Sequence, residues 1–412
     1  AGGHGPWPVR VPERIRTASD LVPFASANVI YAGNDRDEFM GKAGLPHQYD
    51  MWVALGSNVP MSVANGEIIA KILKNVPFGV LFELFSNELA EGFADIVLPD
   101  VCYLENYAFD SFVPFLCQPF GTDPWAYHIG QPIVEPVGQR RNSVDVAWEI
   151  VDRLGMRAKL NESLNRLHGL EGEYSLKPDE KVTLEELADR VVKQWFGPEH
   201  DWEWLKEHGF ISWPKKVEEA YWRYFLDART PIYLEYMVEI KDKVQKTMKE
   251  AGIDYDFTQY TPFISWTPSW IHGDNAEHDL YCYSYRDVLH TGSFTMEQPW
   301  LDEASRMNPY TYNITMNADT AKKKGLKDWD LVEVESVAGR KVRGRLKVME
   351  GHHPRTMAIA CTSGHWAKGM PIARGKGTNF DQLLEFDLQH IDPLNLGLEI
   401  CVRVKVSKAP EG

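Results

Sequence analysis

The sequence predicts an α/β fold that gives way to a helical middle region and then to a strand-rich end. Three observations support this reading. Short apolar strands alternate with helical patterns over residues 1–100, tryptophan-rich helical stretches occupy residues 101–275, and strands of alternating apolar and polar residues dominate residues 276–412. A chain of 412 residues has room for two or three domains, so we expect three domains with these boundaries.

The first region contains three short apolar strands, at residues 51–55, 78–82 and 94–99. Helical patterns separate them at residues 65–74 and 84–93. Strands and helices that alternate at this spacing predict a parallel sheet with right-handed crossovers. Ligands of such sheets bind beyond the carboxyl ends of the strands, and this rule selects the first candidate site residues.

Polar residues follow the first two of these strands. Gly56, Ser57 and Asn58 form a turn whose backbone amides suit a phosphate or a nucleotide sugar. Glu83 ends the second strand, where a carboxylate can accept from a ribose diol or a guanine edge, and the stretch to Asn87 lies on the same edge. Taken alone, a plain turn and a solvated carboxylate explain these residues equally well.

The middle region contains helical patterns at residues 144–154, 184–195 and 214–226. Between the first two of these, residues 161–178 are polar and rich in glycine. Such a composition is typical of irregular surface segments, so we expect a surface insertion there.

The last region contains the most regular pattern of the chain. Its predicted elements are a strand at 312–316, a helix at 320–324, two strands at 331–336 and 341–348, and a closing strand at 398–406. Asn317 or Asp319 can cap the helix, and Gly325 stands where a left-handed residue ends it. Gly339 predicts a hairpin between the two central strands.

Composition limits the classes of function. A formal net charge of −15 argues against nucleic acid binding, because phosphate neutralisation requires clustered Lys and Arg. The five cysteines are scattered without a Cys-x-x-Cys pair, which argues against an iron–sulfur or structural zinc site in this chain and favours buried thiols. No apolar run approaches the roughly 18–20 residues that span a bilayer.

The chain begins without methionine and without the regions of a signal peptide. We therefore interpret it as beginning midway through a longer protein, and the compartment stays open.

A second polar group follows the strand at residues 280–285: Arg286 and His290 stand four apart, a spacing at which both can face a pyrophosphate. A surface arginine and a packed histidine are the alternative.

Several of these segments resemble one family. The unit at residues 308–348 resembles the start of the C-terminal barrel domain of molybdopterin oxidoreductases of the dimethyl sulfoxide reductase family. Residues 83–99, which end in Ala-Asp-Ile-Val-Leu-Pro, and residues 358–366 and 375–383 also resemble family segments. The resemblance implies a nucleotide-binding α/β region with a helical insertion, followed by a six-stranded double-psi-type β-barrel. The branch of polysulfide, thiosulfate and tetrathionate reductases, phenylacetyl-CoA oxidoreductase and transhydroxylases is the most similar.

The resemblance also implies roles for particular residues. It assigns Glu83, Asn87, Arg286, His290, Ser293, Ser363 and Asn379 to the cofactor, and these join Gly56, Ser57 and Asn58 of the strand-end turn as candidate cofactor residues. Glu83 and Asn87 depart from the usual Asp and Thr, and Asp381 replaces a second Asn, so their contacts are less secure. The metal ligand of the family lies upstream, so we expect no metal ligand here, Cys361 included, and the catalytic residues are unknown.

The implied function is that of the C-terminal part of a catalytic subunit that binds bis(molybdopterin guanine dinucleotide) with molybdenum or tungsten. Its expected partners are the N-terminal half or chain that carries the metal ligand, an electron-transfer subunit with iron–sulfur clusters, and a small-molecule substrate. Two alternatives are open: a noncatalytic split or degenerate scaffold that binds the cofactor, and a nicotinamide-dependent dehydrogenase. The chain has no Gly-x-Gly-x-x-Gly after a strand, which disfavours the dehydrogenase.

Overall fold

The structure is a computed structural model of the chain, and it forms two compact units. The first contains residues 1–81, 85–96 and 232–412, and the second contains residues 82–84 and 97–231. The described residues are 49–107, 124–220, 233–250, 252–263, 265–273, 275–385, 390, 392, 394 and 397–410.

The α/β region contains the three predicted strands, which form one sheet in the order β1-β2-β3. The strands are β1 (Met51–Leu55), β2 (Phe78–Glu83) and β3 (Ile96–Pro99), and the helices are α3 (Val59–Ser62), α4 (Gly66–Lys74) and α5 (Glu88–Gly92). β3 begins two residues later than predicted, and just before it the Asp95 carboxylate accepts from the Gly79 amide at 2.8 Å. The parallel direction of these strands stays a prediction.

Helix α4 shows why the sequence folds locally as predicted. Asn65 caps it: the side-chain oxygen accepts a hydrogen bond from the Ile68 amide at 3.3 Å. Ile69, Ile72 and Leu73 lie on one face at helical spacing and are buried in the core of this region. Burial of this apolar face drives the helix onto the sheet.

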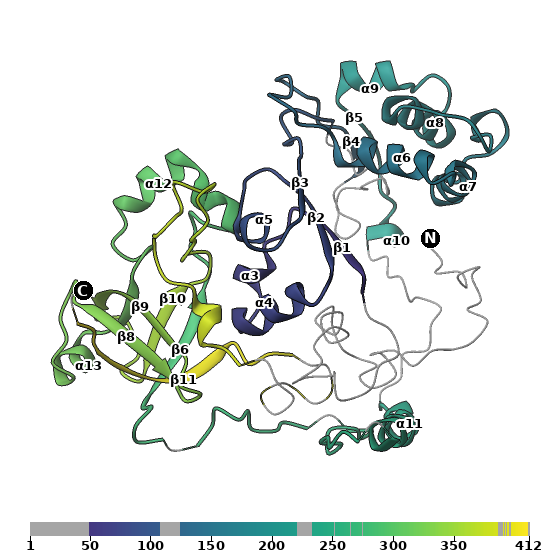
Figure 1. Ribbon diagram of the computed structural model, residues 1–412. Helices are drawn as coiled ribbons and strands as arrows, with labels where there is room; N and C mark the ends of the chain where they lie inside the picture. Colours follow the sequence, from purple (N-terminus) through teal and green to yellow (C-terminus); the bar gives the residue numbers. More distant parts are fainter. Residues whose placement is uncertain are drawn as a thin grey trace. The chain divides into compact units, whose positions relative to one another are not determined.

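The C-terminal region contains a closed barrel of six strands, which confirms that part of the predicted fold (Figure 1). The strands are β6 (Leu280–Tyr285), β7 (Ile314–Asn317), β8 (Leu331–Ser336), β9 (Lys341–Met349), β10 (Thr356–Ala360) and β11 (Cys401–Lys408). Their order around the barrel is β10-β6-β11-β8-β9-β7. The β6–β10 and β7–β9 pairs are parallel, and the other pairs are antiparallel.

The interior of the barrel follows the alternation seen in the sequence. Val332 and Val334 of β8 are fully buried, whereas Glu333 between them pairs with Lys341 and Arg343 of β9. Asn317 caps α13 (Ala318–Lys323) by accepting from the Thr320 amide at 3.0 Å, as one of the two predicted caps. The alternation of apolar and polar residues and the helix cap, both visible in the sequence, are therefore present in the barrel.

Three further helices of this unit matter for the site. They are η3 (Ser293–Glu297), α12 (Pro299–Arg306) and η4 (Phe380–Leu383). The unit also contains α11 (Tyr236–Glu250). Among the described cysteines, all unpaired, Cys282 is buried and the remaining three are half-buried.

The second unit is mainly helical. Its elements are β4 (Trp125–His128), α6 (Ser143–Arg153), α7 (Arg157–His168), η2 (Gly172–Tyr174), α8 (Leu184–Phe196), α9 (Trp202–His208), β5 (Phe210–Trp213) and α10 (Val217–Ala220). β4 and β5 pair in antiparallel fashion. The helices predicted at 144–154 and 184–195 are confirmed. Of the helix predicted at 214–226, residues 217–220 form α10 and residues 221–226 lie outside the described residues.

The prediction of a surface insertion at residues 161–178 is wrong. Half of this stretch lies in α7, and Leu164, Leu170 and Leu176 are buried in the core of the unit. Asn161, which made the stretch look polar, is fully buried, and its amide donates to the carbonyls of Lys177, Pro178 and Glu180. A polar residue is tolerated there because its buried amide group donates to backbone carbonyls of the turn at residues 177–180.

The boundaries expected at residues 100 and 275 stay predictions. In the part of the chain that the structure describes, no helix has both the length and the apolar character needed to cross a membrane. Nor do three or more His, Cys, Asp or Glu side chains of the described residues gather as metal ligands would.

Candidate functional site

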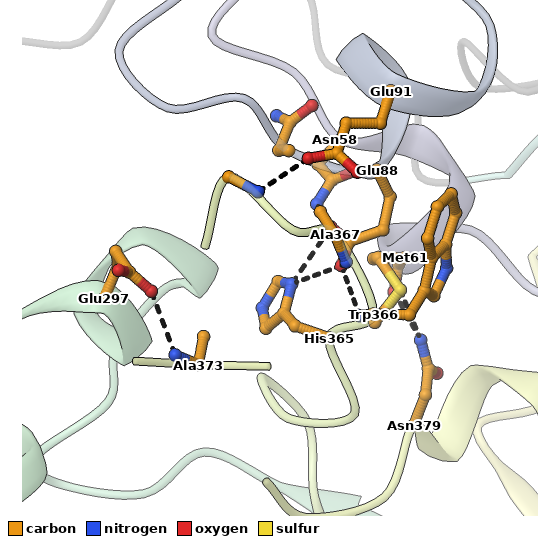
Figure 2. A network of polar contacts seen from close by, with 12 residues as sticks. Asn58, Met61, Glu88, Glu91, Glu297, His365, Trp366, Ala367, Ala373 and Asn379 are labelled. Carbon is orange, nitrogen blue, oxygen red and sulfur yellow. Dashed lines mark hydrogen bonds and ion pairs between the residues drawn. The ribbon is translucent and has the colours of Figure 1, made fainter. Parts of the chain in front are cut away.

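The loop that follows β10, residues 361–379, is held against α5 by a buried carboxylate. Glu88 accepts hydrogen bonds from the Asn58 side-chain amide at 2.7 Å, from His365 Nδ1 at 3.0 Å, and from the amides of Trp366 and Ala367 at 2.7 and 3.0 Å. Figure 2 shows these donors gathered around the carboxylate. We call this loop the 361–379 loop.

Glu88 is charged at neutral pH despite its burial. Burial alone would raise the pKa of Glu88, but the hydrogen bond and electrostatic attraction of His365, with the Ala367 amide and Asn58, outweigh it and lower that pKa to about 2. A carboxylate of this kind accepts hydrogen bonds and donates none. Its partners must therefore turn their N–H groups toward it.

This requirement leaves two buried polar atoms turned away from Glu88. Asn58 points its NH2 group at Glu88, so its Oδ1 faces elsewhere, and His365 presents Nδ1 to Glu88, so its Nε2 faces elsewhere. Both Oδ1 of Asn58 and Nε2 of His365 are buried and have no hydrogen-bond partner among the described residues. Buried polar atoms in native proteins usually have partners, so each of these atoms calls for one.

Two more carboxylates hold the same loop by its backbone. Glu91 accepts from the amides of Lys368 and Gly369 at 2.9 and 2.6 Å. Glu297 of η3 accepts from the amides of Ile372 and Ala373 at 3.1 and 2.9 Å. Figure 2 shows Glu91 and Glu297 on separate helices at two places along the loop. The loop is thus fixed by carboxylate-to-amide hydrogen bonds along much of its length.

The end of the loop packs around Ser363. Its hydroxyl donates to the Thr378 carbonyl at 3.0 Å and accepts from the Thr378 amide at 3.1 Å. Gly377 lies against it, with a positive φ of 67°, and an added Cβ would approach the Ser363 Cβ to 2.4 Å. Ser363 therefore shapes the loop through its hydroxyl; its predicted contact with a cofactor stays a prediction.

Asn379 connects the loop to the α/β region. Its side-chain NH2 donates to the Met61 carbonyl of α3 at 3.2 Å, and its oxygen accepts from the Asp381 amide at 2.8 Å, which caps η4. Burial raises the pKa of Asp381 to about 6. Asn379 thus lies on the same side of the loop as the residues that follow β1.

The predicted residues after β1 gather at α5. Asn87 caps α5 by accepting from the Ala90 amide at 3.0 Å, and its NH2 group donates to the Ser57 carbonyl at 3.1 Å. Gly56 has a positive φ of 55°. Glu83 belongs to the second unit, where its buried carboxylate accepts from the Leu84 amide at 2.8 Å. The structure therefore brings Ser57, Asn58, Asn87, Ser363 and Asn379 around one loop.

The second predicted group follows β6. His290 is buried, with the Ser305 hydroxyl 2.7 Å from Nε2 and the Thr295 hydroxyl 3.3 Å from Nδ1, and burial lowers the pKa of its ring. Ser293 begins η3, the helix whose last residue, Glu297, holds the loop. Both ring nitrogens of His290 thus have partners within the protein, and its contact with a cofactor stays a prediction.

Arg286 lies at the start of the 361–379 loop. Its guanidinium donates to the Thr291 carbonyl and interacts with the Cys361 thiol, whose pKa burial raises in spite of that positive charge. Farther along the loop, Lys376 forms an ion pair with Asp302 of α12, and the Tyr312 hydroxyl donates to Asp302 at 3.0 Å. Neighbours of both predicted groups therefore meet the same loop.

The sequence analysis missed the four residues that organise the site: Glu88, Glu91, Glu297 and His365. The partners of the three carboxylates are mostly backbone amides. Every residue except proline has such an amide, so the sequence does not indicate which of them a carboxylate will bind. Glu88 and His365 are also 277 positions apart along the chain. His365 stands in a segment that resembles the family, yet only its burial with one unpartnered nitrogen distinguishes it.

Comparisons with known proteins bear on this region of the chain. Residues 280–385 match the family model described as Molydopterin dinucleotide binding domain. The chain is 22% identical over 355 residues to the molybdopterin-containing subunit of thiosulfate reductase from Salmonella typhimurium, an alignment that covers 82% of this chain and 41% of that protein. Residues 280–385 therefore contain a molybdopterin dinucleotide binding domain, and the chain is distantly similar to molybdopterin-containing reductase subunits.

Two further proteins are similar to the chain. The molybdopterin-containing subunit of arsenate respiratory reductase from Chrysiogenes arsenatis is 23% identical over 411 residues, which cover 88% of this chain and 46% of that protein. Acetylene hydratase from Pelobacter acetylenicus has a similar fold, with a TM-score of 0.60 and 16% identity over 95% of this chain and 52% of that one. The chain thus spans about half the length of the proteins it matches.

Proposed function

We propose that the chain is the C-terminal part of the catalytic subunit of a molybdenum or tungsten oxidoreductase, and that it holds a bis(molybdopterin guanine dinucleotide) cofactor. The match of residues 280–385 to a molybdopterin dinucleotide binding domain carries this proposal. These residues contain five of the six barrel strands and the whole 361–379 loop that the three carboxylates hold.

The side chains around the loop fit such a cofactor. Asn58 Oδ1 and His365 Nε2 are buried polar atoms without partners among the described residues, and the ring systems of the cofactor carry both N–H donors and lone-pair acceptors. The bound metal would supply two-electron chemistry between oxidation states IV and VI. The protein would hold the organic part of the cofactor, orient it and exclude water around it.

The proposal assigns two sets of contacts. Gly56, Ser57, Asn58, Glu83 and Asn87 would bind the dinucleotide part. Arg286, His290, Ser293, Ser363 and Asn379 would bind the pterin part. Under this proposal residues 1–100 form the nucleotide-binding region, 101–275 a helical insertion, and 276–412 a barrel with double-psi connectivity.

The partners follow from the same assignment. A preceding half of the polypeptide or another chain would supply the metal ligand, and an iron–sulfur subunit would carry electrons. The substrate would be a small molecule. The printed names of the relatives, a thiosulfate reductase and an arsenate respiratory reductase, support a reductase.

Metal and nucleotide analysis tests the proposal. The protein, purified as it occurs in its cell, is analysed by plasma mass spectrometry for molybdenum and tungsten, and by chromatography for guanine and oxidised pterin after acid release. We expect one metal atom and two guanines per chain. Protein with neither metal nor guanine would refute the proposal, and protein with the cofactor but no redox turnover would favour the noncatalytic scaffold.

A further inference from the structure

One face of the β1-β2-β3 sheet is apolar and only half covered. Side chains alternate along β1, so Trp52 and Ala54 lie on one face, where they pack with the core around α4. Met51, Val53 and Leu55 lie on the other face, and they are 51%, 50% and 60% exposed. We call this second face the outer face of the sheet.

Strand β2 continues the outer face. An added Cβ on Gly79 would lie 2.2 Å from the Trp52 ring, so Gly79 faces the same core as Trp52. Its neighbours in the strand, Phe78 and Val80, therefore point to the outer face, where Phe78 is 39% exposed. Neither strand places a polar or charged side chain on this face over residues 51–55 and 78–80, all of which belong to the first unit.

The composition of the outer face indicates a sheet that is buried on both sides. A sheet with one face in water alternates apolar with polar residues, whereas a strand that is buried on both faces reads as a continuous apolar run. β1 reads Met-Trp-Val-Ala-Leu, which is a run of the second kind. Contiguous apolar patches at a surface mark sites of contact with another protein layer. The outer face therefore calls for an apolar layer.

The length of the relatives indicates which layer this is. The chain covers 41% of the thiosulfate reductase subunit and 46% of the arsenate respiratory reductase subunit, so more than half of each relative lies outside the matched part. The outer face offers no charge to an ionic partner, and a chain of net charge −15 repels an acidic one. An apolar surface of the remaining half of the subunit fits both observations.

We infer that the preceding half of the catalytic subunit packs an apolar layer onto the outer face and so covers the second side of this sheet. The inference rests on the proposed function, which assigns that half to the protein. It adds the place where the two halves meet, which is the face formed by Met51, Val53, Leu55, Phe78 and Val80. Contact of this kind depends on apolar burial, so we expect it to persist at high salt.

Photo-cross-linking identifies the layer. The photo-reactive residue p-benzoylphenylalanine replaces Val53 in the protein as it occurs in its cell, the purified protein is irradiated at low and at high salt, and cross-linked peptides are sequenced by mass spectrometry. We expect peptides of the preceding half at both salt concentrations. Val337 is the matched control, because it is a valine of the same unit that is 44% exposed in the hairpin between β8 and β9. The same photo-reactive residue at position 337 should give little of this product.

Oxidation of methionine by hydroxyl radicals measures coverage without a substitution. Met307 is 85% exposed and Met316 is fully buried, so they serve as the upper and lower references. We expect Met51 to be oxidised as slowly as Met316 in the native protein. Val53→Lys would bury an unpaired charge and should raise the oxidation of Met51 about tenfold or more, whereas Val337→Lys should not. Slow oxidation of Met316 in the variant shows that the chain itself stays folded.

Other occupants of the outer face would overturn the inference. A cross-link from position 53 to another part of residues 1–412, to a second copy of the chain or to no peptide does so, as does equal cross-linking to the preceding half from position 337. Oxidation of Met51 at a rate close to that of Met307 has the same consequence. Metal and guanine analysis of the same preparation judges the proposed function separately. Protein that contains both but fails these tests loses the inference alone, and protein that contains neither refutes the proposed function whatever Val53 contacts.

Discussion

Substitution of Glu88 by glutamine gives a local test of the hydrogen bonds that hold the loop. Glu88 has no exposed surface, and its pKa falls from 4.5 to about 2 in the fold. That shift corresponds to about 3 kcal/mol of stabilisation by the charged form at neutral pH. Glutamine keeps a neutral acceptor, so we expect the variant to lose about 2–3 kcal/mol of the free energy of local opening.

Hydrogen exchange of the Trp366 and Ala367 amides is the assay, because both donate to Glu88. The expected loss raises their exchange rates by about 30- to 150-fold at neutral pH, once intrinsic rates are divided out. The amides of Ile372 and Ala373, which Glu297 holds, are the internal control and should exchange as before.

The pH dependence has a definite sign. A carboxyl group whose pKa is lowered by folding stabilises the fold fully above its unfolded pKa, and the stabilisation is lost as the pH falls through the folded pKa. For Glu88 the difference between the two proteins should therefore be constant above about pH 4.5 and shrink toward about pH 2. Equal exchange at neutral pH, or a difference that does not change with acid, would refute the reasoning.

Three other substitutions test the packing. Gly369→Ala would bring a Cβ within 2.4 Å of the Ser86 Cβ, and we expect a loss of about 1–3 kcal/mol and faster proteolysis of the loop; unchanged cleavage would contradict this close approach. Leu346→Ala removes a fully buried barrel side chain and should lower the free energy of unfolding in urea by about 2–5 kcal/mol; a loss below about 1 kcal/mol would place Leu346 outside the core. Asn161→Ala leaves three carbonyls without their donor and should cost about 1–3 kcal/mol in thermal denaturation, against no change if residues 161–178 were a surface insertion.

The elements of the fold were predictable where local chemistry decides them. The cap at Asn317, the left-handed Gly325 with a φ of 72°, and the alternation of Val332 and Val334 with glutamates depend on neighbours in sequence, and the structure contains each of them. The prediction for residues 161–178 was wrong because their structure depends on contacts that are not local in the sequence. Composition records that Asn161 is polar but not that distant carbonyls satisfy its amide.

Several predicted site residues lie near the 361–379 loop, but the contacts that organise this loop were not predictable from the sequence. Asn87 was selected as a ligand residue, and the structure shows its side chain bound to the Ala90 amide and the Ser57 carbonyl. The next residue, Glu88, carries the contact that joins the α/β region to the loop after β10. No local pattern predicts it, because its partners lie 277 to 279 positions away.

The carboxylates that hold the 361–379 loop also limit what the loop can bind. A phosphate-binding loop presents free amides, and a positive local field attracts the anion. In this loop Glu88, Glu91 and Glu297 occupy many of the amides and add negative charge. The amides of residues 366–369 and 372–373 are therefore not free to bind a phosphate. On this reasoning a phosphate would have to bind other amides or cationic side chains of the protein.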